Sequence, residues 1–188
     1  YSICEGAIKI IDLKDFCKKN KIHAIGLSDT KNLCGALEFA ENISKVGTQP
    51  IIGTQINFKF KDQIGILPII ANNFEGYKSI IGLSSKSYLE NKTTDEPHCS
   101  FQELLNIKSG VTILSGSFRG LIGNLFAKNL LTEIDEVLKL IKDVFKDKFY
   151  LEIQRHNDVG EKLFEEFLLN KSNDLAIPLI ATHEVFYL

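Results

Sequence analysis

Short runs of aliphatic and β-branched residues alternate with longer helical patterns along this chain. The expected strands cover residues 23–27, 50–60, 66–70, 111–115, 149–153 and 177–182, and the expected helices cover residues 11–20, 33–46, 73–89, 121–127, 132–145 and 159–171. Such alternation indicates an α/β architecture with mostly parallel strands. No GxGxxG follows the first strand and no GxxxxGK(S/T) is present, so a barrel-like arrangement is favoured over dinucleotide-binding and P-loop folds.

Composition narrows the class of protein further. The net charge is −2, with 22 basic side chains of which only two are arginines, so the chain lacks the basic face of an autonomous nucleic-acid binder. No apolar run reaches the ~18 residues that span a membrane. Four cysteines without a CxxC pair exclude zinc ribbons and favour reduced thiols in a cytoplasmic protein. With neither Met nor a signal-peptide pattern at its start, the chain is expected to be an excerpt or a processed product.

Polar residues lie in or just after several expected strands, at the end where parallel α/β barrels gather ligand groups. They are Asp29, Gln55, Ser117, His156, His183 and Glu184. His23 opens a strand at the opposite end, and His98 lies in the loop-like segment 91–100. Asp29, His156, His183 and Glu184 therefore remain as candidate metal ligands, a poor set for a metal centre.

Each of these polar residues also has a plain structural explanation. Asp29 can cap a helix or bond a loop, and His156 can be a hydrogen-bonded loop imidazole. Ser117 lies in SGSFRG, a sequence typical of a turn. Ser117, His156 and Asp29 are the residue types of a Ser-His-Asp catalytic triad, but no GxSxG motif supports that interpretation.

Seven segments, in one collinear order, resemble those of a known family. Residues 27–39, LSDTKNLCGALEF, resemble the family pattern LTDHGNLFGAVEF, and residues 177–188, IPLIATHEVFYL, resemble IPLVATNDVHYL. The other five segments are residues 1–7, 50–55, 71–77, 114–117 and 149–154. The chain is thereby identified as similar to the N-terminal PHP (polymerase and histidinol phosphatase) domain of bacterial DNA polymerase III alpha subunits.

The resemblance implies a distorted TIM-like (β/α) barrel, formed by residues 1–188 as a single domain that lacks its first strand. It also implies metal-site positions at Glu5, Asp29, Thr30, Gln55, Ile66, Ser117, His156, Glu184 and Phe186. Ile66 and Phe186 have no lone pair, and Thr30 and Gln55 are weak neutral ligands. Ser117 stands where the family has a cysteine. Only Asp29, Glu5 and Glu184 still have a carboxylate at a metal-site position. We therefore expect a degenerate site with no catalytic residue and no metal.

The function implied is that of a structural domain in a longer replicative polymerase. The whole protein would perform DNA-directed DNA synthesis in the cytoplasm, with Mg²⁺ held by a polymerase domain outside this chain. The domain itself would be inactive and would support the polymerase core. It would also dock a proofreading exonuclease and other replicase subunits. DNA would be bound by the whole protein and not by this domain alone.

Two alternatives remain open. One is an active metal-dependent phosphoesterase or 3'-5' exonuclease of the same superfamily, with metal at Asp29, His156 and Glu184. The other is a free-standing small-molecule phosphatase, against which the polymerase-like segments around residues 73–77 and 150–152 argue.

Overall fold

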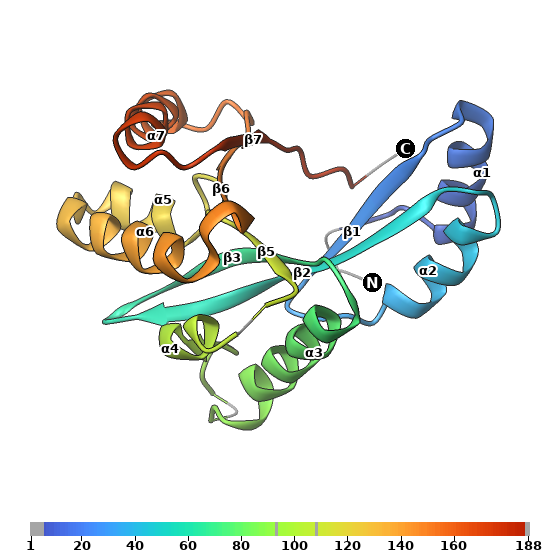
Figure 1. The fold of residues 1–188 in the computed structure, drawn as a ribbon, viewed down its shortest axis with the longest axis horizontal. Coiled ribbons are helices and arrows are strands. Elements are labelled where there is room, and N and C mark those ends of the chain that lie inside the picture. Colours follow the sequence, from blue (N-terminus) through green and yellow to red (C-terminus); the bar gives the residue numbers. More distant parts are fainter. Residues whose placement is uncertain (1–5, 93, 108, 187–188) are drawn as a thin grey trace.

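A curled sheet of seven strands forms the centre of the computed structural model, which describes residues 6–92, 94–107 and 109–186 (Figure 1). The strands are β1 (Ala24–Thr30), β2 (Gln49–Phe60), β3 (Gln63–Ala71), β4 (Cys99–Ser100), β5 (Val111–Leu114), β6 (Phe149–Ile153) and β7 (Leu179–Ala181). The helices are α1 (Ile10–Asn20), α2 (Ala36–Ser44), α3 (Phe74–Leu89), α4 (Phe101–Leu105), α5 (Leu121–Ala127), α6 (Leu131–Phe145) and α7 (Glu161–Leu175), with a 3-10 turn η1 (Lys146–Lys148).

The sheet order is β1-β2-β3-β5-β6-β7, with β4 beside β2. The pairs β1–β2, β2–β4, β5–β6 and β6–β7 are parallel, which confirms the α/β prediction. Strand β3 is the exception, because it runs antiparallel to both β2 and β5. The turn at Lys61 and Asp62 explains this, since strands joined by two residues form a hairpin.

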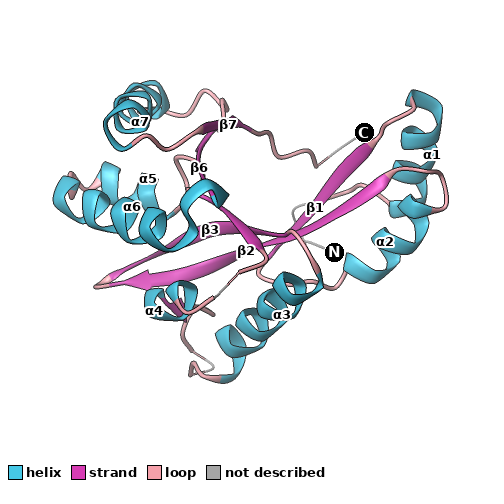
Figure 2. Ribbon diagram, in the orientation of Figure 1, coloured by secondary structure: helices cyan, strands magenta, loops and turns pink. Residues whose placement is uncertain are grey.

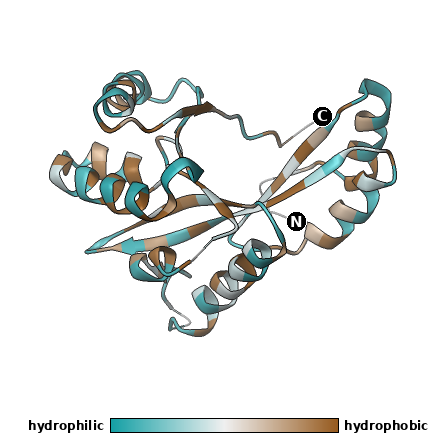
Figure 3. Cartoon of the chain, viewed as in Figure 1, coloured by the Kyte–Doolittle hydropathy of each residue, from teal (hydrophilic) through white to brown (hydrophobic). Residues whose placement is uncertain are grey.

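Helices lie against the outside of the curled sheet (Figure 2). The larger apolar cluster joins β2, β3, β5 and β6 to the inner faces of α3 to α7. A smaller cluster of Ile10, Cys17, Phe39 and Ile43 holds α1 and α2 together at the other end of the molecule. In Figure 3, hydrophobic and hydrophilic residues alternate along the helices.

Several boundaries differ from those expected. The helix expected from residue 33 begins at Ala36, and the strand expected over residues 177–182 is limited to β7. Sequence reasoning missed α4 and β4, although a capping box marks the start of α4. There, the Ser100 hydroxyl accepts from the Glu103 backbone N–H and the Glu103 carboxylate accepts from the Ser100 backbone N–H, an S-x-x-E pattern that predicts a helix start.

The two edge strands of the described sheet, β1 and β7, do not pair with each other. Among the described residues, β1 pairs only with β2 and β7 only with β6. A single backbone hydrogen bond, from Ala7 N to Phe186 O at 3.0 Å, links the two ends of the described chain. The first strand expected before residue 1 stays a prediction.

The described cysteines are free thiols, as predicted. Cys17 and Cys99 are buried, whereas Cys34 is exposed. Burial raises the pKa of the Cys99 thiol to about 12, so Cys99 is an inert core residue. Cys4 lies outside the described residues.

Two glycines of α3 test how tightly this helix meets the segment that precedes β5. A Cβ on Gly76 would lie 1.7 Å from the Gly110 carbonyl oxygen, which already accepts a 2.8 Å hydrogen bond from Asn72 N. Gly76→Ala should therefore lower the free energy of unfolding by about 1–3 kcal/mol, measured by chemical denaturation.

Gly82 provides the matched control in the same helix. A Cβ there meets nothing within 4 Å, so Gly82→Ala should raise the free energy of unfolding by about 0.5–1 kcal/mol through helix propensity. Equal effects of the two substitutions would contradict the close contact at Gly76.

Candidate functional site at the C-terminal ends of the strands

The predicted site residues lie along the side of the curled sheet where its parallel strands end, which we call the polar edge. Strands β1, β2, β5, β6 and β7 all point the same way, so their C-terminal ends face one side. Gln55 lies within the long strand β2, level with Thr30 at the end of β1. Ser117, His156 and Glu184 follow β5, β6 and β7.

A hydrogen bond across the open side of the barrel joins two of these residues. Gln55 Nε2 donates to Glu184 Oε1 at 2.7 Å, and it lies 3.5 Å from the Ser28 carbonyl oxygen. Strand β2 and the segment after β7 belong to opposite regions of the sheet. The bond therefore ties the C-terminal segment to the N-terminal half of the domain.

Asp29 accepts a hydrogen bond from the loop before α2, which is the structural role that the sequence allows for it. It lies inside β1 rather than after it, because β1 extends to Thr30 along β2. Its buried carboxylate accepts from Gly35 N at 3.3 Å, just before α2, and its carbonyl accepts from the Thr54 hydroxyl at 2.8 Å. Asp29 thereby fixes the connection between β1 and α2.

His156 and Ser117 also have local partners. His156 Nε2 lies 3.0 Å from Gln154 Oε1, and its ring stacks on His183 with centroids 5.1 Å apart. The Ser117 hydroxyl accepts from Arg119 N at 3.3 Å, which confirms the expected turn. These contacts give the hypothetical triad no support.

A further carboxylate anchors the loop that carries His156. Glu161, buried at the start of α7, accepts from His156 N at 2.9 Å and from Asn157 N at 2.8 Å. Nearby, Arg119 holds Asp158 with two hydrogen bonds of 2.8 and 2.9 Å. The loop between β6 and α7 is thus fixed by a carboxylate of α7 and by an arginine that precedes α5.

Sequence reasoning missed the most deeply buried acid of the site, Glu152 in β6. Its side chain accepts from Gln154 Nε2 at 3.2 Å and from the Thr182 hydroxyl, while its backbone N–H donates to the Ser115 hydroxyl at 2.9 Å. Burial raises the pKa of Glu152, and the nearby Glu184 raises it further, against the opposing hydrogen bonds from Thr182 and Gln154. A glutamate within the apolar run FYLEI was the available signal.

The residues present do not fit the polynuclear metal centre that the resemblance implies. Ile66 and Phe186 offer no donor atom, and Gln55 presents an amide N–H to Glu184. Over residues 6–92, 94–107 and 109–186, no group of three or more His, Cys, Asp or Glu side chains is arranged to hold a metal ion. Glu5 lies outside the described residues.

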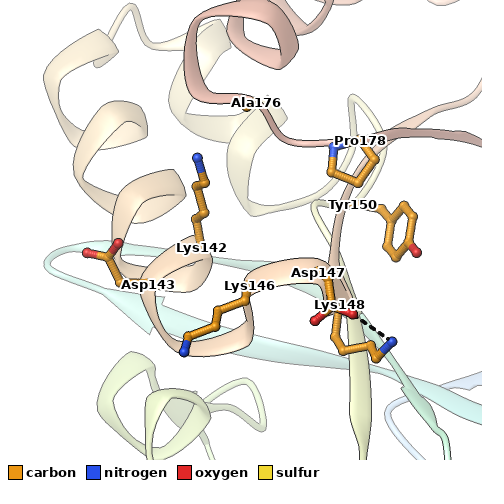
Figure 4. A pocket seen from close by; sticks show the side chains of 8 residues that line it. All are labelled: Lys142, Asp143, Lys146, Asp147, Lys148, Tyr150, Ala176 and Pro178. Carbon is orange, nitrogen blue, oxygen red and sulfur yellow. Dashed lines mark ion pairs between the residues drawn. The ribbon is translucent and has the colours of Figure 1, made fainter.

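A separate surface pocket of about 660 Å³ lies at the opposite end of β6 and β7 (Figure 4). Two of its three lysines have partners, since Lys142 donates to the Leu175 carbonyl oxygen and Lys148 pairs with Asp147 at 2.9 Å. None of the predicted site residues lines this pocket. The polar edge at Gln55 and Glu184 therefore remains the candidate site.

A family model described as the PHP domain matches residues 1–156. The chain belongs to the PHP domain family. Curated relatives are DNA polymerase III alpha subunits, among them those of Rickettsia felis (34% identity over 192 residues) and Caulobacter vibrioides (34% over 200 residues). Both matches cover 100% of this chain but only 16% and 17% of those proteins, so this PHP chain spans about one sixth of its curated relatives.

Solved structures confirm the fold. A protein from Bifidobacterium adolescentis, provisionally described as a metal-dependent phosphoesterase, gives a TM-score of 0.56 at 12% identity, covering 94% of this chain and 82% of that one. An amidohydrolase from Chromobacterium violaceum, with bound sulfate and no metal, gives a TM-score of 0.60 at 7% identity, covering 99% and 85%. Both support the TIM-like PHP architecture. In the part of the chain that the structure describes, no helix is long and apolar enough to cross a membrane.

The buried carboxylate predicts an unusual pH dependence. Because the pKa of Glu152 is raised on folding, the stabilisation that its protonated form provides is present at low pH and is lost as pH rises above the usual glutamate range. Glu152→Gln should therefore unfold at a higher temperature than the parent at pH 7–8, and this advantage should disappear near pH 4.

Glu165→Gln is the control, for which the opposite change in stability at neutral pH is expected. The Arg155 guanidinium lowers the pKa of Glu165, so neutralising Glu165 should cost a little stability at neutral pH and none in acid. Thermal scans at both pH values measure both variants. A Glu152→Gln variant that is destabilised equally at pH 4 and pH 8 would contradict the burial argument.

Proposed function

We propose that this chain is the PHP domain of a replicative DNA polymerase alpha subunit, and that it acts as a metal-free structural domain. The hydrogen bond between Gln55 and Glu184 carries the proposal. Two ligand positions of the family meet there as an amide donor and a carboxylate acceptor. That pairing needs no cation between its members.

Charge explains why this pairing favours a metal-free site. Two carboxylates at hydrogen-bonding distance repel each other unless a cation or a proton lies between them. An amide N–H facing a carboxyl group instead forms a direct hydrogen bond with it, and no cation is needed between the two. The link across the strand ends is thus built from the protein's own side chains.

The activity of the whole protein follows from its relatives. They are named DNA polymerase III alpha subunits, which supports template-directed nucleotidyl transfer in cytoplasmic DNA replication. Its Mg²⁺ would be held by a polymerase domain outside these 188 residues. The PHP domain would contribute by supporting that core rather than by chemistry of its own.

Docking of a proofreading exonuclease is a second part of the proposal and rests on the family resemblance. The natural full-length polypeptide should retain the exonuclease subunit on copurification at micromolar concentrations. Deletion of the PHP domain should abolish that retention, whereas unchanged retention would show that the exonuclease binds elsewhere.

Metal content tests the metal-free role. The natural full-length polypeptide, dialysed against metal-free buffer, should hold less than about a tenth of an equivalent of zinc, manganese or iron by mass spectrometry. About two equivalents, lost in His156→Ala or Glu184→Ala, would instead favour an active metal-dependent phosphoesterase.

Gln55→Glu provides a second test at the decisive contact. Facing Glu184, the new carboxylate should lower the free energy of unfolding at pH 7.5 by about 1–3 kcal/mol, and added Mn²⁺ should not restore it. Gln55→Leu is the control that loses the hydrogen bond without adding charge. Restoration of Gln55→Glu, but not of Gln55→Leu, by Mn²⁺ would show that the site still accepts a metal.

A further inference from the structure

The outward face of α3 carries large apolar side chains that stay exposed in the described chain, although the Lys78 ammonium lies 4.7 Å from the centre of the Phe74 ring. Phe74, Ile81, Tyr88 and Leu89, which we name the outer stripe, are exposed by 66%, 41%, 52% and 82%. Helix α3 runs along the lower edge of the molecule in Figure 1, with no other helix on its outer side. A solvent-facing helix surface is normally polar, so this stripe requires an explanation.

Spacing places three members of the outer stripe on one side of α3, with Lys78 between the first two and Ser85 between the last two. Phe74, Ile81 and Tyr88 are seven residues apart, which places them above one another on a helix. The residues that α3 buries in the domain, including Ile80 and Leu83, lie on the opposite side. Helix α3 therefore carries large apolar residues on a second side as well as on the side that it buries in the domain.

The stripe is also shaped for close contact with another helix. Gly82 and Ser85 lie beside Ile81, and a Cβ at Gly82 would meet nothing within 4 Å. Small side chains between large ones form the depressions into which the side chains of a second helix fit. The nearest lysines are already paired, Lys78 with Glu75 at 3.1 Å and Lys86 with Glu103 at 3.0 Å. The face is therefore suited to an apolar partner rather than to phosphates.

We propose that the outer stripe of α3 is the surface on which a helix from the remainder of the longer polypeptide packs. This inference rests on the proposed function, because it gives the scaffold role a defined contact. The matches to curated relatives, in which the chain spans about one sixth of the length, leave most of such a polypeptide outside these residues. A segment of the same polypeptide reaches the stripe at high effective concentration, which favours it over a separate partner.

Photo-crosslinking in the natural full-length polypeptide tests the contact. A benzophenone amino acid placed at position 88 should form a crosslink between α3 and a peptide beyond residue 188, with no increase in the mass of the polypeptide on a denaturing gel. The same probe at Lys86 is the positive control. Since Lys86 faces Glu103, that probe should crosslink to α4 within the domain.

Each other outcome overturns the inference. A species of doubled mass would assign the stripe to a second copy, and a crosslink to another protein would assign it to a separate partner. No crosslink at position 88, with efficient crosslinking at Lys86, would show that the stripe faces solvent. The metal content of the same polypeptide does not depend on this result, so failure of the docking surface is distinguishable from failure of the scaffold proposal.

A double variant gives an independent readout. Ile81→Lys with Tyr88→Lys should lower the thermal midpoint of the full-length polypeptide by several degrees, because it would bury two charges in the contact. Val159→Lys, at a 98% exposed position before α7, should leave the midpoint unchanged. An unchanged midpoint in the double variant would contradict a buried stripe.

Discussion

The long hairpin of β2 and β3 is the constraint on which the rest of this domain depends. Its two strands pair over eight residue positions and are joined by a two-residue turn. Strands β1 and β4 extend from one side of the hairpin and β5 from the other, while α2, α3 and α5 pack on its surface. Because β3 runs antiparallel to both β2 and β5, the strands on both sides of the hairpin point the same way. Their C-terminal ends therefore share one edge, where the polar residues collect.

Hydrogen bonds from amides, hydroxyls and backbone N–H groups organise that polar edge, although the buried Oε2 of Glu152 has no such partner among the described residues. Gln55 satisfies Glu184, Gly35 N satisfies Asp29, and backbone N–H groups satisfy Glu161. Glu152 is the carboxyl group of this edge whose ionised form is disfavoured, because burial and the neighbouring Glu184 raise its pKa. In a metal centre, a cation would balance such carboxylates. Here amides, hydroxyls and backbone groups surround them instead, which is the basis for proposing a structural role.

Much of the fold could be predicted from the sequence because the signals are local. The apolar periodicity identified α1, α3 and α6 almost to the residue, and alternation of elements indicated the α/β class. Boundaries were wrong where tertiary pairing overrides local preference, as at Asp29, which β2 draws into β1. Helix α4 was missed because five residues carry too little periodicity, although its capping box was present in the sequence.

The site was less predictable because its contacts join distant segments. The resemblance identified which positions to compare, but it did not indicate that Gln55 would donate to Glu184. Glu152 was overlooked because a single acid in an apolar strand has no spacing pattern of its own. Its partners, Thr182 and Ser115, lie on the neighbouring strands or just after them, and only the assembled sheet brings them together.

The hydrogen bond from Gln55 to Glu184 also has a consequence for the order of folding. It spans 129 positions, so it can form only after the chain between those residues has been arranged. Closing a loop of that length costs more conformational entropy than closing the hairpin of β2 and β3, whose turn has two residues. We expect the hairpin to be an early structure and the polar edge to be among the last parts to form. The contact between Gln55 and Glu184 would then secure the domain only once its fold is complete.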